Sequence, residues 1–87
     1  MTYILESSAR EKPRVSARAG VRLDAAAPGL WRVRDHSGFV IGHLQAVTEL
    51  GGTRFRARRF HAATHSFRDL GDFWSADDAV ECLRWGR

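Results

Sequence analysis

The segment from Leu30 to Phe60 constrains the fold more than any other part of the chain. It contains three short runs rich in β-branched and aromatic residues, separated by turns around Gly38 and around Gly51-Gly52. Runs of this kind with glycine between them are typical of an antiparallel meander. The sequence therefore predicts three strands joined by two hairpin turns.

The side chains of these runs divide into an apolar set and a basic set. Successive side chains along a strand point to opposite faces of a sheet. Trp31 and Val33 in the first run share a face with Phe55 and Ala57 in the third. The opposite face receives five arginines: Arg32, Arg34, Arg54, Arg56 and Arg58. We therefore expect a sheet with one side to be covered and one side lined by arginine.

The residues after Ser75 carry the clearest helix signal. Ser75 is a suitable N-cap, and Asp77 and Asp78 fall in the first turn, where carboxylates complement the helix dipole. Four apolar residues then form one stripe at helical spacing: Ala76, Ala79, Val80 and Leu83. We expect this stripe to pack on the apolar face of the sheet.

Residues 1–29 show no sustained period and are expected to form a mostly flexible, basic N-terminal arm. Within the arm, Val21–Leu23 is a candidate short strand and Ala25–Gly29 resembles a linker. Residues 61–65 are expected to be a loop, and Phe67–Phe73 a lead into the helix. The prediction is an α+β domain over residues 30–87, with a three-stranded antiparallel sheet and one C-terminal helix packed on one face.

Composition limits the class of protein. A chain of 87 residues forms one small domain, and 44% hydrophobic residues are enough for a core. The single cysteine, Cys82, excludes an internal disulfide framework. There is no apolar run of the ~20 residues that a bilayer requires and no secretory signal, so we expect a cytoplasmic protein with no membrane partner.

The chain is positively charged, and nearly all of its basic residues are arginine. The net charge is +4, and thirteen of the fourteen basic residues are arginine. Arginine makes forked contacts with phosphate or carboxylate. A GC-rich genome would produce the same bias through its codons.

An arginine-lined sheet face suits a polyanion, since each guanidinium can pair with a phosphate or a guanine edge. We expect non-catalytic binding of nucleic acid, with duplex DNA favoured, through the five arginines. The alternatives are a protein-protein interaction or self-assembling module that binds an acidic protein partner or pairs as a homodimer through a sheet edge, and an ordinary solvated face with no such partner.

The sequence offers no site for catalysis. His61 and His65 are four residues apart, and Cys82 or His43 could complete a metal site with them, but the intervening residues do not form a helical pattern. We therefore expect no enzyme activity, no metal site and no cofactor.

The predicted order of elements, together with several residues, resembles the AP2-type DNA-binding domain and the N-terminal arm-binding domain of tyrosine integrases. The residues are Trp31, Val33, Gly38, Leu70-Gly71-Asp72-Phe73, Ser75 and Ala79. The resemblance covers roughly Leu30 to Trp85, and it implies that the sheet face opposite the helix contacts DNA through the strand arginines. The pattern is also similar to small orphan proteins of high-GC bacteria and their phages.

Overall fold

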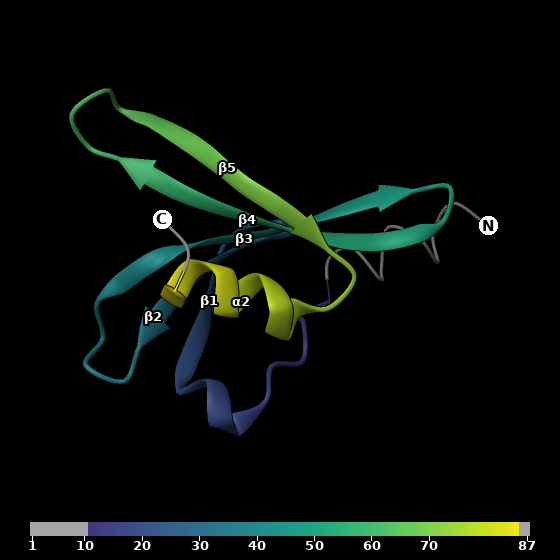
Figure 1. The fold of residues 1–87 in the computed structure, drawn as a ribbon, viewed down its shortest axis with the longest axis horizontal. Coiled ribbons are helices and arrows are strands. Elements are labelled where there is room, and N and C mark those ends of the chain that lie inside the picture. Colours follow the sequence, from purple (N-terminus) through teal and green to yellow (C-terminus); the bar gives the residue numbers. More distant parts are fainter. Residues whose placement is uncertain (1–10, 86–87) are drawn as a thin grey trace.

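The structure, a computed structural model, describes residues 11–85. It contains a 3₁₀ turn η1 (Ala17–Ala19), five strands and one helix. The strands are β1 (Val21–Ala27), β2 (Leu30–Asp35), β3 (Val40–Glu49), β4 (Gly52–His61) and β5 (Ser66–Phe73), and the helix is α2 (Ala76–Trp85). The strands form one antiparallel sheet in chain order, and α2 follows the last strand (Figure 1).

The α+β class is confirmed, but the predicted three-stranded sheet is wrong because the sheet has five strands. The first additional strand, β1, occupies Val21–Ala27. It begins at the candidate short strand Val21–Leu23 and continues through residues that were expected to form a linker. Leu23 explains its place in the sheet, since it is buried opposite Val33 of β2. Residues 1–10 of the expected arm lie outside the described residues.

The second additional strand, β5, occupies Ser66–Phe73, where only a lead into the helix was expected. Its sequence lacks period-2 alternation, and its register explains why. Ala57 pairs with Gly71 and Arg58 pairs with Asp69, so Leu70 is an extra residue that forms a bulge. A bulge shifts the alternation by one residue, which hides the strand from a search for that pattern.

The helix covers one face of the sheet, as predicted. The Ser75 Oγ accepts a hydrogen bond from the Asp78 amide at 3.1 Å, which confirms the N-cap. All four stripe residues are buried, and they form the core with residues of four strands: Leu23, Trp31, Val33, Leu44 and Ala57. Burial of a side chain such as Val80 or Leu83 contributes roughly 1.5–3 kcal/mol.

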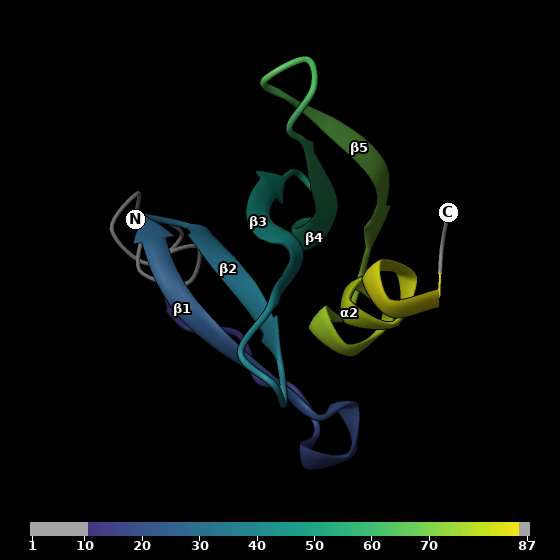
Figure 2. The same cartoon turned by 90° about the vertical axis from the view of Figure 1, so that its left-hand side faces the viewer.

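Hydrogen bonds join the turn η1 and its N-cap to the helix α2. The Ser16 amide donates to Asp77 Oδ1 at 2.7 Å, and the Arg84 guanidinium donates to the Ala19 carbonyl. Figure 2 shows α2 on one side of the sheet, and no helix or strand of residues 11–85 covers the other side. Within residues 11–85, no helix has both the length and the apolar character needed to cross a membrane.

Candidate nucleic-acid interface

The five predicted arginines lie on the sheet face opposite α2, which we call the open face. Trp31, Val33 and Ala57 are buried toward the helix, so their strand neighbours point to the other side. The register then brings Arg32, His43 and Arg58 into one row across β2, β3 and β4. Strand β1 adds Arg22, which stands opposite Arg34.

Strand β5 brings two carboxylates onto the open face. Asp72 holds Arg56 through two hydrogen bonds, Nε to Oδ1 at 2.8 Å and Nη2 to Oδ2 at 3.1 Å. This bidentate pair lowers the pKa of Asp72, through the hydrogen bond first and the charge of Arg56 in addition. Arg58 Nε lies 2.8 Å from Asp69 Oδ1, and its Nη1 donates to Gln45 Oε1 at 3.2 Å.

Strand β1 and the β3–β4 turn supply two more carboxylates. Arg34 Nε lies 2.6 Å from Asp24 Oδ2, and Asp24 Oδ1 lies 3.7 Å from Arg22. Arg54 lies 3.9 Å from Glu49, and its guanidinium carbon is 4.2 Å from the ring centroid of Trp74. The open face therefore carries acidic partners for its arginines, and three of these four carboxylates come from β1 and β5, which lie outside the predicted three-stranded sheet.

Arg32 differs from the other four predicted arginines. Within residues 11–85 no carboxylate lies within ion-pair distance of it. Its cross-strand neighbour is Asp24, but the Asp24 oxygens face Arg34 and Arg22. Arg32 is therefore the arginine of the predicted set whose charge remains available to an anionic ligand.

The sheet splits beside Arg32. Strands β3 and β4 pair from the Glu49–Gly52 end only as far as His43 and Arg58. Beyond that row, the start of β3 pairs with β2, through Arg34 and Val40, while the end of β4 pairs with β5, through His61 and Ser66. The β2–β3 and β4–β5 hairpins consequently diverge at the same end of the molecule (Figure 1).

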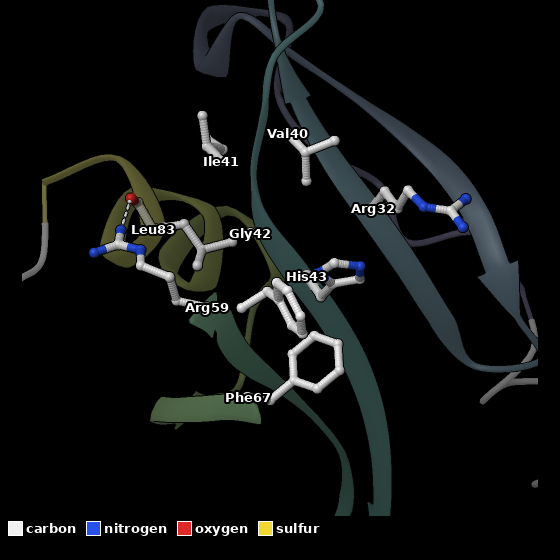
Figure 3. A pocket seen from close by; sticks show the side chains of 9 residues that line it. Arg32, Val40, Ile41, Gly42, His43, Arg59, Phe67 and Leu83 are labelled. Carbon is white, nitrogen blue, oxygen red and sulfur yellow. Dashed lines mark hydrogen bonds between the residues drawn. The ribbon is translucent and has the colours of Figure 1, made fainter. Parts of the chain in front are cut away.

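A cleft of about 750 Å³ lies at this split, and we call it the split-end cleft. Its apolar lining includes Val40, Ile41, Phe60, Phe67 and Leu83. Its polar lining is Arg32, His43 and Arg59, with no carboxylate. Figure 3 shows Arg32 on one side of β3 and Arg59 on the other, where the Arg59 guanidinium donates to the Leu83 carbonyl at the end of α2.

Aromatic rings gather in this cleft. The Phe67 centroid lies 5.0 Å from that of His43 and 5.3 Å from that of Phe60, both in edge-to-face geometry. The Arg58 guanidinium lies 4.7 Å from the Phe67 centroid. Phe60 is 45% exposed and Phe67 38% exposed, so the core does not enclose them.

His43 reports the positive potential of the cleft. Partial burial lowers the pKa of His43, and the charges of Arg32 and Arg58 lower it further. The His43 Nδ1 is buried without a hydrogen-bond partner among the described residues. A neutral imidazole beside two arginines leaves the guanidinium groups as the cations of this site.

The sequence indicated the arginines but missed the rings. Phe60 continues the alternation of Arg54, Arg56 and Arg58, so that pattern alone places it on the open face. Phe67 could be placed only with β5, because it stands opposite Phe60 in that pairing. The considered metal site has no counterpart, since residues 11–85 contain no group of three potential ligands.

Comparisons of the chain with models of protein families, with curated proteins and with solved structures find no match, so the resemblance stated above stays untested and the geometry carries the functional argument.

Proposed function

We propose that this protein binds nucleic acid without catalysis, through the open face of its sheet. The observation that carries the proposal is Arg32, an arginine with no carboxylate partner among the described residues, which lines the same cleft as the exposed rings of Phe60 and Phe67. Guanidinium groups pair with phosphates, and aromatic rings stack on bases. The proposal places the protein in the cytoplasm, in accordance with its single free cysteine.

The charge balance of the open face supports a polyanion of moderate affinity. Six arginines on this face meet four carboxylates, so the face is positive but partly neutralised. Each internal pair must be weakened before its arginine can serve a phosphate fully. We therefore expect fewer productive phosphate contacts than the number of arginines.

The width of the sheet limits how the open face could contact duplex DNA. Five strands at about 4.8 Å spacing span roughly 19 Å, whereas the major groove is about 12 Å wide. The whole open face would therefore not enter the groove, and a duplex would meet one hairpin or the phosphates along the groove edges.

The test is fluorescence anisotropy with labelled random-sequence DNA, both duplex and single-stranded, at low and moderate salt. Arg32→Gln is the informative variant, because no described carboxylate loses a partner. Arg68→Gln is the matched control, since Arg68 is exposed on β5 and alternates with the open-face residues Phe67 and Asp69. We expect salt-sensitive binding that Arg32→Gln weakens several-fold and Arg68→Gln does not. Absence of binding to both forms at micromolar protein and low salt would exclude the proposal.

An acidic protein partner is the second candidate, because the same positive face would suit it. The sheet also has two edges, β1 and β5, through which two copies could pair. Binding of an acidic protein should persist with excess competitor DNA. Sedimentation of the free protein over a range of concentrations tests for a homodimer.

A further inference from the structure

The split-end cleft has a chemistry that a double helix does not use. A duplex offers phosphates on its outside and keeps the faces of its bases stacked inside. Exposed aromatic rings stack on bases that have left the helix, and each such contact strengthens binding. Phe60 and Phe67 are exposed rings inside the cleft, so they suit an unstacked base.

The dimensions of the cleft agree with one nucleotide. Its volume of about 750 Å³ falls within the range of roughly 300–1,000 Å³ that is usual for small-molecule sites. Its floor is closed by Leu83, whose Cδ2 occupies the space that a Cβ on Gly42 would need. A flat ring could enter from the open face and rest between the two hairpins.

The charges of the cleft select an anion. The lining contains Arg32, His43 and Arg59 and no Asp or Glu. Arg32 lines the cleft from β2, and in Figure 3 its guanidinium extends away from His43 and Phe67. It is therefore placed for the phosphate next to a bound base and not for the base itself. An apolar peptide would gain nothing from Arg32, whereas a nucleotide matches both the rings and the cation.

We propose that the split-end cleft binds one unstacked base of a single-stranded nucleic acid, with the neighbouring phosphate on Arg32. This inference rests on the proposed function and narrows it from nucleic acid in general to single strands. The rings and guanidinium groups of the cleft suit DNA and RNA alike, so the experiment includes a single strand of each.

The experiment compares a labelled thymidine oligomer of about twelve nucleotides, the matching uridine oligomer and a duplex of equal length, all at low salt. We expect at least one single strand to bind about tenfold more tightly than the duplex. Phe67→Ala should weaken single-strand binding about tenfold and leave duplex binding unchanged. The matched control is Phe39→Ala, which removes a ring that is 72% exposed in the β2–β3 turn and outside the cleft.

A second measurement uses the unmodified protein and so does not depend on the folding of a variant. An oligomer of the same length with abasic sites in place of bases keeps every phosphate and sugar and removes every base. We expect its affinity to be about tenfold lower than that of the thymidine oligomer. Equal affinity for the two oligomers, or equal affinity for single strand and duplex, would overturn the cleft proposal while leaving nucleic-acid binding in place. No binding to any probe would overturn the proposed function itself.

Discussion

Gly42 shows how a missing side chain shapes both the core and the cleft. A glycine inside a strand often marks a close neighbour or a bulge, and the structure has both at Gly42. Leu83 packs on it, and Ile41 next to it is the extra residue in the β2–β3 register. A Cβ at Gly42 would lie 2.4 Å from Leu83 Cδ2 and 2.9 Å from the Arg58 carbonyl oxygen. The second of these atoms is backbone and cannot turn away.

We expect Gly42→Ala to lower the free energy of unfolding by about 1–3 kcal/mol, because it overpacks the contact between α2 and the sheet. Urea denaturation measures the change. Gly51→Ala is the matched control, since its Cβ would meet only the Trp74 ring at 3.4 Å. Equal stability of the Gly42 variant and the wild type would show that helix and sheet are not held at this distance.

The contact with Leu83 gives a second prediction at this scale. Leu83→Ala removes a side chain that is 2% exposed, and we expect a loss of about 2–5 kcal/mol. In the double variant Gly42→Ala/Leu83→Ala, the shortened side chain at position 83 makes room for the methyl group added at position 42. The double variant should therefore lose less stability than the sum of the losses of the two single variants, by roughly 0.5–3 kcal/mol. Strict additivity in urea denaturation would contradict the packing of Leu83 on Gly42.

His43 gives a prediction about pH. Its pKa is lowered in the folded state, by burial first and by Arg32 and Arg58 next, so the folded protein binds this proton less readily than the unfolded chain does. The stabilisation is fully present above the unfolded pKa of about 6.5 and is lost as pH falls below it. The melting temperature should therefore fall more between about pH 7 and pH 5 in the wild type than in His43→Gln. His36→Gln, in an exposed turn, should behave as the wild type, and identical decreases in all three proteins would exclude the effect.

At the scale of elements, strands with alternating hydrophobic residues could be predicted from the sequence. A strand held in the sheet mainly by charge pairs could not. Strands β2 to β4 and the helix can be predicted from the spacing of apolar residues such as Trp31, Val33 and the stripe that ends at Leu83. Strand β5 is exposed along half of its length, contains a bulge and is tied to β4 by Asp69 and Asp72. Sequence periodicity does not record such pairs, because the partners are more than ten residues apart.

Because the predicted sheet lacked β1 and β5, the surroundings of the open-face arginines could not be predicted either. The arginines were identified from alternation within β2 and β4, but three of the four carboxylates that face them lie on β1 and β5. Whether an arginine is available depends on its neighbour across the sheet, and that neighbour is known only once the strand order is known. Arg32 therefore could not be separated from Arg56 by sequence alone.

The carboxylates of β5 should act as internal competitors of nucleic acid. Asp69→Asn removes the negative charge that holds Arg58 beside the Phe67 ring. We expect this variant to bind single-stranded nucleic acid several-fold more tightly at low salt, in anisotropy titrations. The cost in stability should stay below about 1 kcal/mol, because the Asp69 side chain is 51% exposed.

Glu81→Gln is the control for this variant. It makes the same change of charge on the exposed surface of α2, across the sheet from the open face. An equal gain of affinity in both variants would mean that net charge alone governs binding. A gain confined to Asp69→Asn identifies the pair with Arg58 as the competitor.

At the scale of the whole molecule, the described residues form two unlike faces. The helix face encloses the apolar core, and on the open face five of the six arginines form a network with four carboxylates. A network of this kind orients the guanidinium groups and limits how many phosphates they can neutralise at once. The salt dependence of binding measures that number.

We expect the affinity for single strands to fall with salt at a logarithmic slope of roughly −2, as for about three phosphates at −0.7 each. Arg32 would supply one contact, and the more exposed Arg22, with a side chain 67% exposed, another. Five independent arginines would instead give a slope of about −3.5. A slope that steep in anisotropy titrations would show that the pairs with Asp24, Asp69 and Asp72 open on binding. In that case Asp69→Asn would leave the slope unchanged, whereas an intact network predicts that it becomes steeper by about 0.7.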